Sequence, residues 1–309
     1  MTASLDLPAD LPAGFTARPL TLDDAPAVLA AIAAEEVVDL GEPEMTLEDV
    51  LADWQRPSYD IASSTIGVLD GDLLVGYGDV AGPDIGYAAV LPAYQGRGIG
   101  TAIAHWIQAT ARARGSVRIG AQVPAGSAAE RLMRDLGYAE RWTAWDLELP
   151  EGAELVARPL PDALTVRDAT EADREAAWAL LESCFLEWSD RERMSLEDFG
   201  SRIWGRPGYE PWNLRLVHTR SGDLVGATHV HLAGEGGYVA KVGVRPDHRG
   251  RGLAPAMLVD AFDLARGHGA VRCYLSTDTR AGARGLYEKV GMVVSSTWVN
   301  RAVELQADP

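Results

Sequence analysis

The first half of the chain alternates apolar and polar positions in a pattern that predicts two helices between short strands. An apolar strand at 15–18 precedes a helix that Thr21 opens, and acidic residues in its first turn suit the positive end of a helix dipole. A second helix is expected to begin at Thr46 and to end before Pro57. Two apolar runs then join through the Asp-Gly-Asp sequence at 70–72, which predicts a β-hairpin.

The pattern continues with strands and helices in alternation. A β-rich run at 85–90 leads into a glycine-rich loop and a long helix over 98–112. A further strand at 117–123, a helix at 128–136 and closing strands complete this half. The order predicts an α/β fold with a mixed sheet.

The second half repeats this order. Its elements are expected at 164–167, from Thr170, from Ser195 to before Pro207, and at 239–244, 252–266, 271–277 and 281–290. Identities recur in order along both halves, as when the Met-Thr-Leu-Glu-Asp run at 45–49 returns as Met-Ser-Leu-Glu-Asp at 194–198. Such ordered self-similarity predicts two homologous halves.

The halves meet near 150–163, where four residues interrupt any periodic pattern: Pro150, Gly152, Pro159 and Pro161. Proline fixes the backbone and glycine broadens its freedom, so the segment is interpreted as a linker. We therefore expect an N-terminal domain at 1–150, a linker at 151–163 and a C-terminal domain at 164–309.

Composition narrows the class of protein. The 309 residues are 47% hydrophobic, enough for two cores, yet no run approaches the roughly 18 apolar residues that a membrane span needs. The first 15 residues have neither the basic start nor the apolar centre of a secretory signal. The two cysteines, Cys184 and Cys273, exclude a disulfide framework. These features predict a cytoplasmic protein.

The net charge of −17 bears on partners. Nucleic acids and anionic membranes are repelled at long range, so neither is expected as a partner. A small cationic substrate would be attracted, although an acidic surface also serves solubility alone.

Two glycine-rich loops carry the candidate chemistry. The candidate binding residues are Gln95, Gly96, Arg97, Gly98, Ile99 and Gly100 in the first loop, and Arg249, Gly250, Arg251, Gly252, Leu253 and Ala254 in the second. Each loop opens a helix, whose free N–H groups and dipole form a site suited to phosphate. An ordinary strand-to-helix turn is the alternative, but two equivalent copies favour phosphate binding. Pro255, just after the second loop, lacks an N–H and removes one donor.

The spacing excludes a Walker loop, because neither copy ends in Gly-Lys-Ser/Thr, and it lacks the context of a dinucleotide fingerprint. Both copies instead match Gln/Arg-x-x-Gly-x-Gly/Ala, and so resemble the acyl-CoA signature of the GCN5-related N-acetyltransferases (GNATs). Two such domains in tandem resemble the mycothiol synthase-like, two-domain actinobacterial acetyltransferases. The resemblance covers nearly the whole chain.

The resemblance implies acetyl-CoA as co-substrate, with its pyrophosphate held by the loop amides. It also implies that main-chain groups near Ala88 and Val90, or Val242 and Val244, pair with the pantetheine arm and polarise the thioester carbonyl. No metal is expected, since His229 and His231 lack further ligands at suitable spacing.

The resemblance also places a tyrosine as the acid that protonates the departing thiolate. In the C-terminal half this position holds Tyr287, whereas the N-terminal half has Met133, whose thioether donates no proton. The base is less defined. Asp84 fits the N-terminal position, its C-terminal counterpart is Tyr238, and Glu235 lies nearby. A packing role for Tyr287 and solvated loop roles for the two carboxylates are the alternatives.

We therefore expect two tandem GNAT domains, with the C-terminal one catalytic and the N-terminal one degenerate. The favoured function is acetyl transfer to a primary amine of a small, cationic molecule by direct attack on the thioester. The amine of a Cys-linked amino sugar, an aminoglycoside-like compound, a polyamine and an amino-acid derivative all stay open as acceptors. A non-catalytic acyl-CoA sensor and a transferase for longer acyl groups are the competing functions. The protein is expected to be a monomer or a homodimer.

Overall fold

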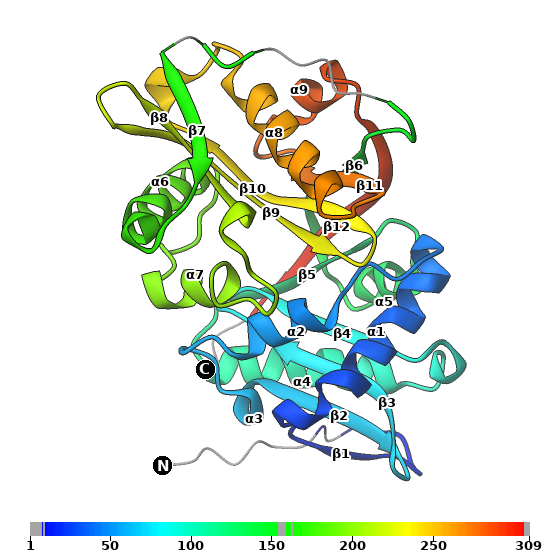
Figure 1. Cartoon of the computed structure of the whole chain (residues 1–309). Coiled ribbons are helices and arrows are strands. Elements are labelled where there is room, and N and C mark those ends of the chain that lie inside the picture. Colours follow the sequence, from blue (N-terminus) through cyan, green and yellow to red (C-terminus); the bar gives the residue numbers. More distant parts are fainter. Residues whose placement is uncertain (1–7, 9, 154–158, 162, 306–309) are drawn as a thin grey trace. The chain divides into compact units, whose positions relative to one another are not determined.

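The fold was analysed in a computed structural model, which describes residues 8, 10–153, 159–161 and 163–305. The chain forms two compact units (Figure 1). Unit 1 contains residues 1–143 and 297–309, and unit 2 contains residues 144–296. The repeat predicts a division at 151–163, of which 154–158 and 162 lie outside the described residues. Each unit thus includes a segment from the other half of the sequence: residues 297–309 belong to unit 1, and residues 144–150 belong to unit 2.

Unit 1 contains an antiparallel sheet of four strands, β1 to β4. Its elements are β1 (Thr16–Arg18), α1 (Ala25–Leu40), α2 (Leu47–Trp54), α3 (Ile61–Ser64), β2 (Thr65–Asp70), β3 (Leu73–Val80), β4 (Gly86–Val90), α4 (Ile99–Ala113), β5 (Arg118–Pro124), α5 (Ala128–Asp135) and the start of β6 (Ala139–Glu148). Strands β1 to β4 pair in sequence order. Beside β4 lies β5, and its other side pairs with the last part of β12 (Val293–Glu304), over Trp298–Glu304.

Unit 2 repeats this arrangement. After the end of β6 come β7 (Leu164–Asp168), α6 (Arg174–Leu186), α7 (Leu196–Arg202), β8 (Leu214–Thr219), β9 (Leu224–Ala233), β10 (Gly236–Val244), α8 (Leu253–Gly267), β11 (Arg272–Asp278), α9 (Arg284–Lys289) and the start of β12. Strands β7 to β10 are antiparallel, and β11 pairs with β10 in parallel and with β6 antiparallel. The expected α/β fold with a mixed sheet is confirmed.

Local sequence explains where the elements begin. The Thr46 and Ser195 hydroxyls accept hydrogen bonds from the N–H groups of Asp49 and Asp198, so both predicted helix starts are confirmed. The long helix α4 begins at Ile99, one residue later than predicted, because Gly98 adopts a left-handed conformation with φ of 86°. Helix α9 begins at Arg284 rather than at 281, because Gly282 has φ of 61°.

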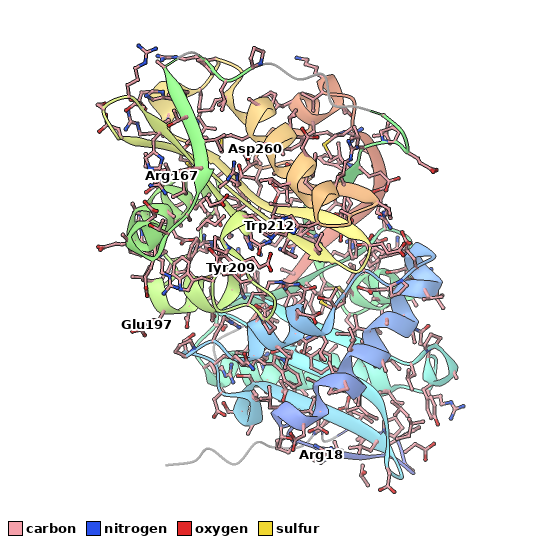
Figure 2. The ribbon with its side chains drawn as sticks, viewed as in Figure 1. Arg18, Arg167, Glu197, Tyr209, Trp212 and Asp260 are labelled. Carbon is pink, nitrogen blue, oxygen red and sulfur yellow. The ribbon has the colours of Figure 1, made fainter. Side chains whose placement is uncertain are left out.

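The repeat extends to its ion pairs. Arg18 pairs with Asp24 at 2.6 Å, and Arg167 pairs with Asp173 at 2.7 Å (both arginines are labelled in Figure 2). The guanidinium of Arg18 lowers the pKa of Asp24 to about 2. Both pairs fasten the first strand of a unit to the start of its first helix.

Helices cover both faces of each sheet. In unit 1 the apolar side chains of α4 pack on one face around Ile103 and Trp106, and those of α1 and α2 pack on the other around Val28 and Trp54. Unit 2 follows the same plan with α8 and α9 on one face and α6 and α7 on the other. None of the helices in the described part of the chain is long and apolar enough to cross a membrane.

Candidate functional site: two forks and their loops

Each unit contains a fork, which we define as the place where two parallel strands separate. In unit 1, β4 and β5 meet only at the bridge between Ile85 and Gly120. In unit 2, β10 and β11 pair from Gly236–Arg272 to Val239–Leu275 and no further. A parting of parallel strands leaves main-chain groups on the inner edges, where an extended ligand can bind.

The glycine-rich loops lie at the end of β4 and β10 and have matching backbones. Gly96 and Gly98 have φ of 74° and 86°, and Gly250 and Gly252 have φ of 73° and 81°. These left-handed conformations favour glycine, which explains the repeated Gly-x-Gly.

The first turns of α4 and α8 have free donors. The first helical bond after each loop runs from Ala102 to Gly98 or from Ala256 to Gly252. The N–H groups of residues 99–101 therefore have no partner inside α4, and those of Leu253 and Ala254 none inside α8. Pro255 stands where unit 1 has Thr101, so the second loop has one donor fewer.

The first residue of each motif fastens the loop to the strand before it. Gln95 Nε2 donates to the carbonyl of Val90 at 3.3 Å, and Arg249 Nε donates to that of Val244 at 2.8 Å. Arg249 also makes two bonds to the Glu187 carboxylate, at 2.6 and 2.7 Å. Among the predicted binding residues, Gln95 and Arg249 therefore orient the loop, and the side chain of Arg97 bonds the Ala93 carbonyl at 3.2 Å.

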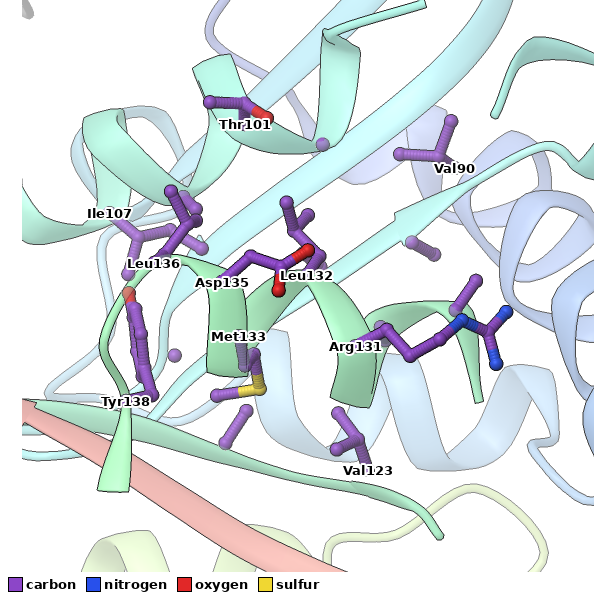
Figure 3. Close-up of a pocket in the computed structure, with 18 of the residues that line it drawn as sticks. Val90, Thr101, Ile107, Val123, Arg131, Leu132, Met133, Asp135, Leu136 and Tyr138 are labelled. Atoms are coloured by element: carbon purple, nitrogen blue, oxygen red, sulfur yellow. The ribbon is translucent and has the colours of Figure 1, made fainter. Parts of the chain in front are cut away.

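The fork of unit 1 opens into a cavity of about 430 Å³. Its lining comes from β4, β5, α4 and α5, and it includes Ala88, Val90 and three of the loop glycines. Figure 3 shows Val90, Thr101 and the α5 residues Leu132 and Met133 among the side chains that line it. The lining is largely apolar, as suits the arm of a CoA thioester.

Glu35 of α1 is a functional candidate that the sequence analysis missed. It lines this cavity and accepts a hydrogen bond from Gln95 Nε2 at 3.2 Å. Burial, and after it the nearby charge of Asp39, raises the pKa of Glu35 to about 7. Hydrogen bonds from the Val90 N–H and from Gln95 lower it and offset part of this rise. Its spacing from Val28 and Ala31 puts it on the buried stripe of the helix, and that was the available signal.

Tyr138 also lines the unit 1 cavity, and its hydroxyl accepts a hydrogen bond from Gln108 Nε2 at 3.1 Å. Burial raises the pKa of Tyr138.

In unit 2, Tyr287 lies in the core under the fork. It is 7% exposed and belongs to the apolar cluster that contains Val239 and Leu275, the last paired residues before β10 and β11 separate. Burial raises the pKa of Tyr287 to about 12, so its hydroxyl keeps its proton at neutral pH. The corresponding residue of unit 1, Met133, faces that unit's cavity.

The two candidate bases lie in loops before the forks. Glu235 is exposed in the turn between β9 and β10, where its carbonyl accepts from the N–H groups of Val271 and Arg272. No described contact brings Glu235 to Tyr287. Asp84 forms ion pairs with Arg141 at 3.1 Å and with Arg118 at 3.6 Å.

A polar cluster lies across β9 and β10 on the face that α6 and α7 cover. His229 pairs in register with Lys241, and His231 pairs with Tyr238. The two histidine rings are 5.2 Å apart, and His231 packs edge-on against Tyr238 at 5.5 Å. Within the described ranges no group of three or more His, Cys, Asp or Glu side chains is arranged to hold a metal ion.

Comparison with known proteins agrees with this geometry. The model of the acetyltransferase (GNAT) family matches residues 30–138 and again residues 174–292. Mycothiol acetyltransferase of Streptomyces coelicolor is 30% identical over 240 residues, which cover 74% of this chain and 76% of that protein. The mycothiol acetyltransferase of Thermobispora bispora is 31% identical over 233 residues, 72% of this chain and 77% of that protein.

Solved structures share the two-unit fold. A GCN5-related N-acetyltransferase from Sphaerobacter thermophilus matches with a TM-score of 0.76 at 28% identity, over 96% of this chain and 97% of that one. A tandem GNAT protein from the clavulanic acid biosynthesis pathway matches in fold with a TM-score of 0.71 at 16% identity, over 96% of this chain and all (100%) of that one. The chain therefore belongs to the GNAT family as a tandem pair of its domains, and is an acyltransferase whose acyl donor is a CoA thioester.

Proposed function

We propose that this protein transfers an acetyl group from acetyl-CoA to the primary amine of a small molecule, and that the reaction takes place in unit 2. The observation that carries the proposal is the position of Tyr287, a protonated hydroxyl in the core beside the last Val239–Leu275 pair. Unit 1 has a thioether at this position, Met133, and so has no equivalent acid. We propose that unit 1 keeps the CoA-binding architecture without the catalytic acid.

Acyl-CoA would be held mainly by backbone. We assign the pyrophosphate to the N–H groups of the loop, from Gly250 to Ala254 in unit 2 and from Gly96 to Gly100 in unit 1. Main-chain groups of Val242 and Val244, or of Ala88 and Val90, would pair with pantetheine along the open edge of the fork. A main-chain N–H aimed at the thioester oxygen would stabilise the charge that develops there.

The transfer requires two proton movements. The neutral amine attacks the thioester carbon, the carbon–sulfur bond breaks, and the thiolate takes the Tyr287 proton. The nitrogen gives up one proton, for which Glu235 stays our candidate through water, since it lies in an exposed turn. The net charge of −17 favours the approach of an acceptor in its ammonium form.

The test measures CoA release and the mass of the acetylated product with a panel of amines. Because the relatives are named for mycothiol, the panel includes desacetylated mycothiol, together with an aminoglycoside, a polyamine and amino-acid derivatives. Tyr287→Phe should lower kcat by about 100-fold or more, in the range that a lost general acid costs. The matched control is Tyr59→Phe, which alters a partly buried tyrosine of unit 1.

Either of two results would reject the proposal. One is no acetylation of any amine by protein that binds acetyl-CoA, and the other is an equal loss of kcat in Tyr287→Phe and Tyr59→Phe.

A further inference from the structure

The middle of β10 is open although the strand lies in the interior of its sheet. Its pairing with β11 ends at Val239, and the next residues, Ala240 to Val242, are partly exposed. The side chain of Lys241 leaves the strand at this point toward α6 and α7. It therefore stands beside the fork, on the face opposite the core that contains Tyr287.

Lys241 is a cation whose described neighbours include no ion-pair or hydrogen-bond partner. Its Nζ lies 4.6 Å from the ring centre of Phe185 and 5.9 Å from that of Phe199. Over the described chain, no carboxylate pairs with it and no acceptor receives a hydrogen bond from it. Aromatic faces compensate an ammonium group only in part, so its removal from water stays costly.

Glu182, the carboxylate whose charge acts on Lys241, already has hydrogen-bond partners of its own. Glu182 is 1% exposed, and each of its oxygens accepts from Arg191 at 2.7 Å. One oxygen also accepts from the Met194 N–H at 2.9 Å. Its charge acts on Lys241 as well, but its hydrogen bonds go to Arg191 and Met194, so Lys241 shares this carboxylate without bonding it.

The other neighbours make the region more positive. Burial, and after it the charge of Arg202, lowers the pKa of Lys241 to about 8, against the opposing charge of Glu182. His229, opposite Lys241 in the ladder, is 2% exposed, and its Nε2 has no hydrogen-bond partner among the described residues. Burial first, then the charges of His231, Lys241 and Arg206, keeps the pKa of His229 well below its usual range. His229 is thus a neutral group with an unused ring nitrogen.

We propose that Lys241, together with the Nε2 of His229, binds an anionic group of the acceptor, a carboxylate or a phosphate ester. This inference rests on the proposed function. Among the acceptor classes that the sequence leaves open, it favours an amine that also carries an anionic group over a polyamine or an aminoglycoside. The anion supplies an ion-pair partner for Lys241 and can accept a hydrogen bond from the Nε2–H tautomer of His229.

The same charge also serves the reaction. An acceptor ammonium held near Lys241 experiences a like charge, which lowers its pKa and increases the neutral fraction that can attack. The anionic group offsets the repulsion that would otherwise prevent binding. A purely cationic acceptor has no such compensation.

The first experiment compares matched acceptors with acetyl-CoA. Each amino acid is tested against its amide for the carboxylate, and O-phosphoethanolamine against ethanolamine for the phosphate ester. At least one anionic member should exceed its uncharged partner about tenfold or more in kcat/KM, as a charged hydrogen bond implies. Lys241→Met should remove this preference through KM, and Lys241→Arg should retain most of it. Lys289→Met replaces the other lysine of the chain, which is exposed, and is the matched control.

The second experiment needs no turnover. With two lysines in the chain, ¹³C-labelled lysine gives two Cε signals, which Lys241→Met assigns. In the presence of CoA, the anionic probes should shift the Lys241 signal, and the amides and ethanolamine should not. If the signal responds but no amine is acetylated, the anion site stands and the transferase proposal fails.

The anion site itself is overturned by either of two results. The first is equal activity and an unmoved Lys241 signal with all charged and uncharged pairs. The second is an equal fall of kcat for every acceptor in Lys241→Met, which would place Lys241 at the reacting atoms.

Discussion

The two units share a backbone and differ in the charges that they place on it. Position 79 in β3 of unit 1 is an aspartate, and its counterpart in β9 of unit 2 is His229. Asp79 is 4% exposed and accepts hydrogen bonds from the hydroxyls of Tyr59 at 2.5 Å and Tyr77 at 2.8 Å. His229 is equally buried but has an unused nitrogen beside Lys241. Unit 1 thus has a satisfied acid where unit 2 has an unsatisfied, positive region.

The same contrast holds around the forks. Lys241 has its counterpart in Tyr87, which is 43% exposed at the unit 1 cavity. In the loops, Thr101 of unit 1 has an N–H donor, whereas its counterpart Pro255 in unit 2 has none. In the first helix, Glu35 of unit 1 is replaced by Cys184 in unit 2. The loop glycines keep their backbone angles in both units, whereas Lys241 and His229 differ in charge from their counterparts Tyr87 and Asp79. On the two proposals above, the backbone shared by both units serves the acyl donor, and the α6–α7 face of unit 2 serves the acceptor.

The largest effect is expected when the two halves of the sequence are separated at the repeat. A fragment of residues 1–150 loses the seven residues of β12 that pair with β5, together with the ion pair between Arg301 and Glu130 at 2.8 Å. We expect it to lack a cooperative thermal transition by circular dichroism. The same fragment joined through a flexible linker to residues 297–305 should regain one. An isolated 1–150 fragment that melts like the full chain would show that unit 1 does not need its exchanged strand.

A large effect is also expected at the loop glycines. Valine at Gly98 or Gly252 would have to adopt φ of 86° or 81°, which costs about 2 kcal/mol, or roughly 30-fold in affinity. Calorimetry with acetyl-CoA should give two sites in the unaltered chain, one in Gly98→Val and one in Gly252→Val. Equal thermal midpoints of the variants control for misfolding. A single site that only one substitution removes would mean that one unit binds no donor.

The elements of each unit are predictable from the sequence because their signals are local. Thr46 and Ser195 cap helices by bonds within four residues, and Gly98 and Gly252 are needed by their own backbone angles. The exchange of closing strands was not predictable, because apolar alternation in β12 does not reveal which sheet it joins. Lys241 was missed for a similar reason. In the sequence it is one polar residue in a strand. Its special environment comes from the rings of Phe185 in α6 and Phe199 in α7, which are far from it along the chain.

A smaller effect is expected from exchanging the residues after the loops. Pro255→Thr restores an N–H and a hydroxyl to unit 2, and Thr101→Pro removes both from unit 1. One hydrogen bond to a phosphate oxygen is worth about 1.5 kcal/mol, so the affinity for acetyl-CoA should rise about tenfold in unit 2 and fall about tenfold in unit 1. The two affinities are measured in variants that carry the glycine substitution in the opposite loop. Changes of the same sign in both units would contradict the assignment of these donors to phosphate.

The smallest expected effect is an opposite response of the two units to pH. Burial raises the pKa of Asp79 to about 6, so the folded unit 1 binds a proton that the unfolded chain has lost. This contribution to stability is lost as pH rises from about 4 through about 6, and it levels off above that. The lowered pKa of His229 makes the stability of unit 2 change with pH in the opposite direction. Unfolded histidine takes up a proton below about 6.5 while folded His229 stays neutral, so unit 2 loses stability as pH falls through that range.

Hydrogen exchange followed by mass spectrometry measures this response for each unit, after correction for intrinsic exchange rates. Between pH 7.5 and 5.5 the free energy of opening should rise by about 1 kcal/mol in β3 and β4 and fall by a similar amount in β9 and β10. Asp79→Asn should reduce the first change, because Glu35, with its pKa of about 7, supplies the remainder, and it should leave the second. His229→Gln should remove the second change and leave the first. If both units weakened together in acid, and Asp79→Asn left unit 1 unchanged, the reversed charges of the two units would have no energetic consequence.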